Sequence, residues 1–271
     1  MAQSDPGTAE EHALELTWLG TAGFEIRLGD QVILIDPYLS RNPRARPVQD
    51  LRPGDMRGAE RIFISHGHFD HLLDVPRIAA ALKATVFCDR VAARSLIREG
   101  FPEKRIVRVD YDGQTFEFPG FRARAGFSRH VKFDLPLILR TLARANVRLP
   151  GLRPLVRNYP TGQVLSWRFD YRDRSILHFG SAGSSKQELE RLADQQPDVL
   201  LVPLQGHSAI CEIALEYVRV LRPKTVIPHH HDDFYPPVSM MVDPDPFLKG
   251  LEREFPEVKA IVPRMNRGIV L

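Results

Sequence analysis

Short apolar runs alternate with amphipathic segments along most of this chain. Runs rich in β-branched and aromatic residues predict strands over residues 14–18, 23–28, 31–35, 106–109, 115–118, 163–169, 175–179, 199–204, 225–227 and 260–262. Apolar residues at helical spacing predict helices over residues 75–82, 89–98, 186–193 and 209–221. Because strands precede helices in both halves, the pattern predicts an α/β protein in which packed sheets are covered by helices.

Length and composition indicate one domain. The 271 residues show no fixed repeat and no Pro/Gly/Ser-rich linker, so we expect a single globular domain over 1–271. Residues 1–13 are polar and lack the apolar stretch of a secretory signal, so we expect them to be a flexible start. Cys88 and Cys211 lack the spacing of a zinc knuckle. We expect both thiols to be reduced, which predicts a cytoplasmic protein.

Charge and hydropathy exclude some partners. A net charge of +3 over this length is too small to favour nucleic acid, and no apolar run approaches the roughly 18 residues that span a bilayer. We therefore expect no nucleic-acid partner and no transmembrane segment. The oligomeric state stays open, with a homo-oligomer among the alternatives.

The residues with the clearest chemistry follow one apolar run. Residues 61–64 predict a buried strand, and this strand leads into Ser65-His66-Gly67-His68-Phe69-Asp70-His71. Imidazole and carboxylate groups are the usual ligands of zinc and related divalent metals. His66 and His68 are two residues apart on an extended segment and so point the same way, whereas Asp70 and His71 curve toward a second position. The cluster predicts a metal site.

More histidines follow two other apolar segments. His130 follows residues 121–129, and His229, His230 and His231 follow the β-like run 224–228. A lone histidine is more often an ordinary polar residue, but the position of His130 after a strand, in a chain that carries the cluster, favours a ligand role.

These motifs resemble the metallo-β-lactamase superfamily of metal-dependent hydrolases. The resemblance rests on His66-x-His68-x-Asp70-His71, on the later His130 and on the histidine after Val226-Ile227-Pro228. Residues 16–24 and 32–38 look like the branch of ascorbate-6-phosphate lactonase-like and N-acyl-phosphatidylethanolamine phospholipase D-like proteins. The resemblance extends from about Leu14 to the C-terminus and implies a four-layer αββα sandwich, with metals at one edge between the sheets.

The resemblance also implies roles for individual residues. His66, His68 and His130 would bind one metal, and Asp70, His71 and His230 would bind the other. His230 is favoured over its neighbours because family members place the ligand second after the proline; His229 and His231 would flank the site or face solvent. Asp36 matches a carboxylate behind the ligands, which fixes the orientation of a ligating imidazole; an Asx turn before Pro37 is a compatible interpretation.

One position departs from the family pattern. The strand at 175–179 runs into Gly180-Ser181-Ala182-Gly183, where the family has Gly-Asp-Thr-Gly and its aspartate bridges the two metals. Two dications about 3.5–4 Å apart repel strongly, and a neutral hydroxyl is a poor substitute for the bridging anion. We expect a weakened or absent second metal at Ser181. Asp134, Asp232 and Asp233 are the acids that could reach inward instead.

A segment over 131–160 belongs to this protein more than to the family core. Arg140, Arg144 and Arg148 lie at i, i+4 and i+8 of a predicted helix that ends by Pro150, with leucines beside them. A basic, leucine-rich lid would suit an anionic or lipid-like substrate, with Arg140 and Arg144 as contacts. The alternative is a surface helix packed on the core or on another subunit.

Two further histidines have competing interpretations. His207 ends the predicted strand at 199–204 and is a candidate proton donor or substrate contact. A loop histidine that caps the following helix is an equal alternative. His178, inside a strand, is expected to be structural.

The leading hypothesis is a metal-dependent hydrolase that takes one or two divalent ions, zinc or manganese, with iron also compatible. A metal-bound water or hydroxide would attack a small-molecule ester, lactone or phosphodiester, with Asp70 as base or orienter. The alternative hypothesis is a catalytically degenerate relative that binds a metal or ligand without turnover.

Overall fold

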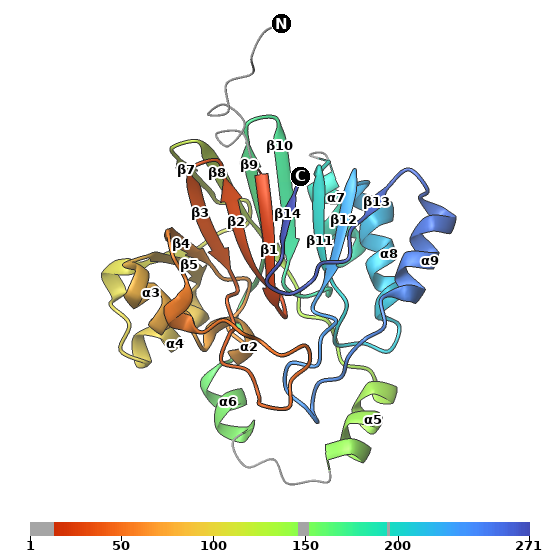
Figure 1. The fold of residues 1–271 in the computed structure, drawn as a ribbon, viewed down its shortest axis with the longest axis horizontal. Helices are drawn as coiled ribbons and strands as arrows, with labels where there is room; N and C mark the ends of the chain where they lie inside the picture. The colour runs from red at the N-terminus through yellow and green to blue at the C-terminus, as the bar shows by residue number, and fades with distance from the viewer. Residues whose placement is uncertain (1–13, 146–151, 194–195) are drawn as a thin grey trace, which may run out of the picture.

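The computed structural model describes residues 14–145, 152–193 and 196–271. The expected flexible start at 1–13, Arg148 and Pro150 lie outside the described residues. Within the described ranges the strands form two sheets of seven, shown with their helices in Figure 1.

The first sheet is built mostly from the N-terminal half of the chain. Its strands in spatial order are β14 (Gly268–Val270), β1 (Leu14–Gly20), β2 (Gly23–Leu28), β3 (Gln31–Ile35), β4 (Ala59–Phe63), β5 (Thr85–Asp89) and β6 (Ile106–Val109). The strands β1 to β3 are antiparallel, and β3 to β6 are parallel.

The second sheet repeats this mixed arrangement with later strands. Its strands in spatial order are β13 (Lys259–Ala260), β12 (Thr225–His229), β11 (Val199–Pro203), β10 (Arg174–Phe179), β9 (Val164–Tyr171), β8 (Phe121–Ser128) and β7 (Thr115–Phe118). The strands β7 to β10 are antiparallel, and β10 to β13 are parallel.

Helices connect and cover these strands. They are α2 (Phe69–Leu72), α3 (Val75–Leu82), α4 (Arg90–Arg98), α5 (Leu135–Ala145), α6 (Leu152–Asn158), α7 (Lys186–Ala193), α8 (Ile210–Leu221) and α9 (Asp245–Glu254), with short 3-10 turns η1 (Pro53–Asp55) and η2 (Glu103–Arg105). In Figure 1, α3 and α4 lie to the left of the sheets, α8 and α9 lie to the right, and α5 and α6 lie below the strands.

Three buried clusters of apolar side chains separate four layers. In β3, Ile33 and Ile35 join the cluster between the sheets, while Val32 and Leu34 join the cluster under α3 and α4. The third cluster lies between the second sheet and α7 to α9. Successive side chains of a strand point to opposite faces, so strands buried on both faces are continuously apolar. The architecture confirms the predicted αββα sandwich.

Several predicted elements differ from the structure. The helix expected to run toward Pro150 is described as α5, ending at Ala145, and a separate α6 begins at Leu152. The strand expected over 260–262 is the two-residue β13. The sequence analysis missed α2, α6, α9, β5 and β14. β14 has only three residues and is held by pairing to β1. Because these strands are far apart in sequence, the residues of β14 alone do not predict a strand.

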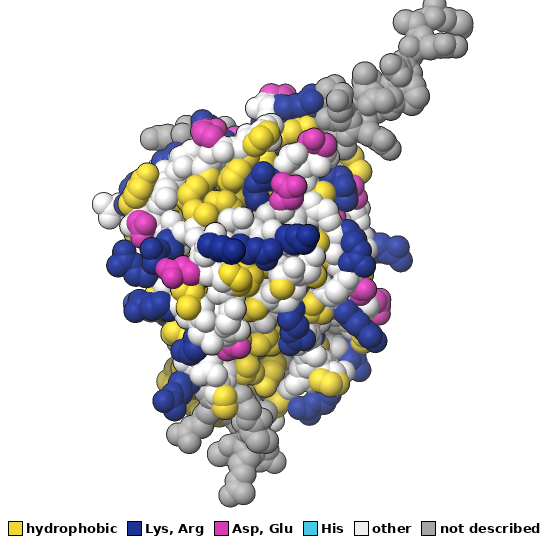
Figure 2. Space-filling model, turned by 90° about the vertical axis from the view of Figure 1, so that its left-hand side faces the viewer, with side chains coloured by type: hydrophobic (Ala, Val, Ile, Leu, Met, Phe, Trp, Pro, Cys, Tyr) yellow, Lys and Arg dark blue, Asp and Glu magenta, His cyan; other side chains and the backbone are white. Residues whose placement is uncertain are grey.

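Charged side chains are dispersed over the helical face of the first sheet. Figure 2 shows the side of the molecule on which α3 and α4 lie, with basic side chains spread over the whole face and acidic and apolar ones between them. Among the described residues, no helix is both long enough and apolar enough to cross a membrane.

The core between the sheets predicts a large stability effect at Phe63. This fully buried ring stacks on Phe87 at 4.8 Å between centroids and contacts Trp167 and Phe169 edge-on. We expect Phe63→Ala to lower the free energy of unfolding by about 3–5 kcal/mol, because it leaves a cavity. Urea denaturation measures the change. Val48→Ala, at a side chain that is 60% exposed, is the control and should change it by less than about 0.5 kcal/mol; an equal effect of both variants would contradict the packing account.

Candidate metal centre

The histidine cluster lies where β4 ends and α2 begins. His66 is in the connecting loop, His68 is the residue before α2, and Asp70 and His71 are in its first turn. Gly67 fits between the two histidines because a Cβ there would lie 2.3 Å from the carbonyl oxygen of Pro160. The loop can therefore pack against residues 160–161 and still direct both imidazoles to one side.

The two distant histidines come from the second sheet. His130 follows β8, and His230 follows β12 with a left-handed backbone (φ +55°). That conformation is uncommon outside glycine and costs free energy that the surroundings must offset. The N–H of His230 donates to the Thr21 carbonyl at 2.9 Å. The chain is thus turned sharply at the residue that enters the site.

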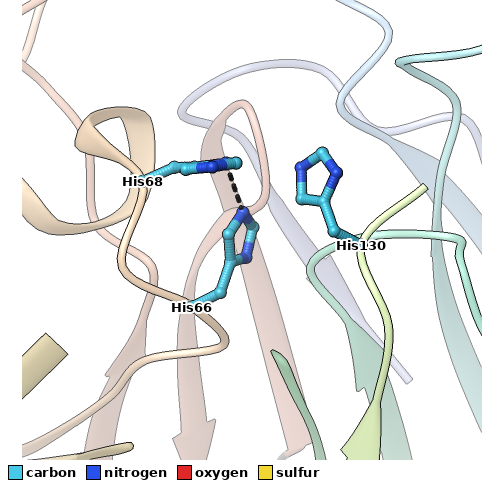
Figure 3. Close-up of side chains that lie close together, drawn as sticks. All are labelled: His66, His68 and His130. Atoms are coloured by element: carbon cyan, nitrogen blue, oxygen red, sulfur yellow. Dashed lines mark hydrogen bonds between the residues drawn. The ribbon is translucent and has the colours of Figure 1, made fainter. Parts of the chain in front are cut away.

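These side chains form two adjacent groups. The potential ligand atoms of His66, His68 and His130 all lie within 4.8 Å of one another, and so do those of Asp70, His71 and His230. Figure 3 shows the first group, with three imidazoles that converge on one space from the loop after β4 and the segment after β8. The structure therefore brings together the six ligands that the sequence analysis named.

The separations between donor atoms match the needs of a small cation. His66 Nε2 lies 3.1 Å from His68 Nδ1, and Asp70 Oδ2 lies 3.5 Å from His71 Nε2 and 3.4 Å from His230 Nε2. Zinc–nitrogen bonds of about 2.0–2.1 Å at tetrahedral angles place two ligand atoms about 3.4 Å apart. The donor set of both groups fits a divalent metal.

Hydrogen bonds on the outer ring nitrogens fix which nitrogen faces inward. Ser65 Oγ donates to Asp36 Oδ2 at 2.5 Å and accepts from His66 Nδ1 at 3.0 Å. His71 Nδ1 donates to the same carboxylate oxygen at 2.8 Å. A neutral imidazole has one donor and one acceptor nitrogen, so Nε2 of His66 presents a lone pair to the site. Burial lowers the pKa of His71, but Asp70 and Asp36 raise it more, so this pKa lies above its usual value. Asp36 has the predicted place behind the ligands.

The other histidines of the first group are held in the same manner. His130 Nδ1 donates to the Val131 carbonyl at 2.7 Å, which leaves Nε2 as its acceptor. His68 Nε2 lies 2.7 Å from Thr161 Oγ1, with Nδ1 directed at His66. The sequence analysis missed Thr161, since a single threonine before a glycine gives no local signal of a role at a site more than ninety residues away.

Burial keeps the imidazoles of the first group neutral. Desolvation, with a smaller contribution from the neighbouring imidazoles, lowers the pKa of His66 well below its usual value. Burial also lowers the pKa of His68 to about 4 and lowers that of His130. For Asp70, burial would raise the pKa, but His71 and His230 together lower it. The site thus offers neutral nitrogens and one ionised carboxylate, which are the forms that bind metals.

No second carboxylate reaches the site from the described residues. Ser181 lies beside the ligands, and its Oγ accepts the N–H of Val131 at 3.0 Å. The three acids considered as replacements are engaged elsewhere: Asp232 pairs with Arg41 and accepts the Thr21 N–H, Asp233 accepts from Ser239, and Asp134 accepts from Ser208.

The neighbours of His230 pack against other rings. His229 is fully buried and stacks on His178 at 5.1 Å between ring centroids, and His231 stacks on Trp18 at 4.8 Å. His178 Nε2 donates to the Ala22 carbonyl at 2.9 Å. His229 therefore does not face solvent, and His231 is half-buried beside Trp18.

His207 accepts a hydrogen bond from the backbone just before α8. Its Nδ1 accepts the N–H of Ala209, directly before α8, at 3.0 Å. His207 is not among the residues that line the cavity over the metal groups. The geometry therefore gives it no access to a substrate in that cavity.

The cavity over the two groups is large and mostly apolar. It has a volume of about 390 Å³, and its walls include side chains of α5, α6 and the segment after His230. Arg140 and Arg144 are exposed on α5 and do not line it. The side chains of α5 that line it are Leu137, Ile138, Thr141 and Leu142.

Comparisons with known proteins agree with a metal-binding role for this chain. Residues 15–230 match the family model described as a beta-lactamase superfamily domain. A UPF0173 metal-dependent hydrolase of Myxococcus xanthus is 30% identical over 265 residues, 97% of this chain and 85% of the relative. One from Polynucleobacter asymbioticus is 25% identical over 94% of this chain and 83% of its own length. The solved structure of Igni18, a metallo hydrolase from Ignicoccus hospitalis, shares the fold with a TM-score of 0.70 at 20% identity, covering 96% of this chain and 98% of that one.

The hydrogen bonds of Asp36 predict its effect on metal affinity. Asp36→Asn places an amide donor where the carboxylate accepts from Ser65 and His71, so the outer nitrogens of two ligands lose their fixed orientation. We expect zinc affinity, measured by competition with a chromogenic chelator, to fall about 10- to 100-fold. Asp30→Asn, the same change at an exposed turn, is the control. Unchanged affinity in Asp36→Asn would contradict the orienting role.

Proposed function

Because this chain belongs to the beta-lactamase superfamily and, within it, to the UPF0173 family of metal-dependent hydrolases, we propose that it cleaves an ester, lactone or phosphodiester at the metal groups described above. The observation that carries the proposal is the convergence of the ring nitrogens of His66, His68 and His130 on one space. The outer nitrogens of His66 and His130 are engaged by hydrogen bonds, and the ionised carboxylate of Asp70 lies beside them. The narrower lactonase-like or phospholipase-like branch, and zinc or manganese as the metal, are parts of this proposal.

Different residues of the chain would bind the metal, accept the proton and orient the ligands. His66, His68 and His130 would hold one ion, and Asp70, His71 and His230 offer a second position. A divalent cation bound there would supply an activated water and polarise the bond to be cleaved. Asp70, kept ionised by its histidine neighbours, would orient that water and accept its proton. The outer hydrogen bonds of Ser65, Asp36 and Val131 keep the ligand nitrogens directed at the reacting centre.

The charge of the site favours one tightly held ion. Six candidate ligands contribute a single carboxylate, and Ser181 is neutral at the position where the family has a bridging acid. A second dication about 3.5–4 Å from the first would be repelled with little to offset it. We infer that the three-histidine group binds the catalytic ion and that the second position binds weakly.

Turnover should depend on the ligands and not on His207. We expect His66→Ala and Asp70→Ala to lower kcat/KM at least about 100-fold against a panel of phosphodiesters, lactones and carboxylic esters. His207→Ala is the matched histidine control and should stay within about twofold. If the wild-type protein binds metal and turns over no member of the panel, the alternative of a degenerate binding relative, which Ser181 favours, replaces the hydrolase.

Restoring the missing acid tests the charge argument directly. We expect Ser181→Asp to tighten binding of a second equivalent of zinc at least about tenfold, because a carboxylate offsets the repulsion between the ions. Isothermal titration calorimetry separates the first equivalent from the second.

Ser181→Asn is the control for this variant. Its side chain has the size and hydrogen-bonding oxygen of aspartate without the charge, so the N–H of Val131 keeps an acceptor. If both variants bind the second ion as the wild-type protein does, the serine is not the cause of weak binding.

A further inference from the structure

We propose that the cavity over the metal groups binds an uncharged substrate with an apolar acyl chain, so that the protein cleaves carboxylic esters or lactones in preference to phosphate esters. The inference rests on the hydrolase function proposed above and names its substrate class. It replaces the anionic substrate that the arginines of 131–160 suggested.

The cavity has a polar floor and apolar walls. The candidate ligands form the floor, together with Ser181. Leu137, Ile138 and Leu142 of α5 form one wall, and Val238 and Met240, from the segment after His230, also line the cavity. A pocket of about 390 Å³ lies in the range that holds small organic ligands. A substrate whose reactive group is at the floor would have its remaining atoms against these side chains.

Several apolar side chains that line the cavity are exposed to solvent. Ile138 is 42% exposed, Leu142 is 58% exposed, and Val156 of α6 is 62% exposed, although all three line the cavity. Apolar surface in contact with water is unfavourable, and contiguous exposed apolar patches often mark binding sites. An acyl chain anchored at the floor would cover this wall, because floor and wall belong to the same cavity.

The charge of the lining argues against a phosphate. Among the described residues, no lysine or arginine lines the cavity. Arg41, the buried arginine of the region, is paired with Asp232, and Arg140 lies outside the lining. Sites for phosphate typically use arginine or lysine donors, and two-metal phosphodiesterases place both ions on the reacting group. This site has neither the cations nor the bridging acid.

The proposed reaction is ordinary ester hydrolysis. The oxygen of water bonds to the acyl carbon, and the bond between that carbon and the alcohol oxygen breaks. One proton of the water passes to the departing alkoxide, so that the products are a carboxylic acid and an alcohol. No oxidant or reductant is required.

A chain-length series tests the proposal on the full chain loaded with zinc. The substrates are p-nitrophenyl acetate, butanoate, hexanoate and octanoate, with bis(p-nitrophenyl) phosphate for comparison, and the rate of His66→Ala is subtracted as background. We expect kcat/KM to rise about fourfold for each added methylene until the cavity is filled. The phosphodiester should react at least about 100-fold more slowly than the octanoate. A flat series, or a faster phosphodiester, would overturn the proposal.

Two leucines of α5 give a matched pair of variants. Leu142 lines the cavity and Leu139 does not, yet their exposed fractions are 58% and 57%. We expect Leu142→Gln to lower kcat/KM for the octanoate more than for the acetate, and so to flatten the series. Leu139→Gln should leave the series as it is in the wild-type protein. Equal effects of the two variants would contradict a role of the cavity wall.

A binding measurement separates this inference from the hydrolase function. Calorimetric titration with methyl ketones of increasing alkyl length reports on the cavity without turnover. Tighter binding of longer ketones with no ester cleaved would support the apolar cavity and reject the hydrolase. Ester cleavage without any dependence on chain length would support the hydrolase and reject the apolar cavity. No binding and no cleavage would reject both.

Discussion

One buried carboxylate organises the metal centre. Asp36 ends β3 with a left-handed backbone (φ +43°) and is fully buried. Its Oδ1 accepts the N–H of Ser65, and its Oδ2 accepts from Ser65 Oγ and His71 Nδ1. Through these bonds it orients His71 directly and His66 by way of Ser65. Both metal groups therefore depend on a residue that is not itself a candidate ligand.

The sandwich explains why ligands so distant in sequence meet. Strands β4 and β12 belong to different sheets, and the apolar cluster between the sheets packs one sheet against the other. The segment after β8 completes the first group with His130. The helices α5 and α6 lie beyond this edge of the strands in Figure 1, and their apolar residues extend the centre into a cavity. Chemistry at the floor and substrate selection at the wall thus come from different parts of the chain.

The sequence was most informative where local pattern and long-range structure agree. The apolar runs at β3, β4 and β11 predicted strands, and the cluster of His66, His68, Asp70 and His71 predicted a metal site. It was least informative for side chains placed by tertiary contacts. The hydrogen bond between Thr161 and His68, the burial of His229 and the stacking of His231 on Trp18 depend on packing between segments far apart in sequence. The sequence also does not decide which residues of α5 face the cavity: Leu137 and Leu142 line it, whereas Leu139 and the two arginines do not.

The central claim is that this chain holds a catalytic divalent ion in a site with a single carboxylate. Its most direct test is the metal content per chain, by elemental analysis of protein purified without chelators or a metal-affinity column. The account predicts about one equivalent of zinc or manganese. Two tightly held equivalents would contradict the charge argument at Ser181. Little or no metal, with none regained on adding zinc or manganese, would contradict the metal centre itself.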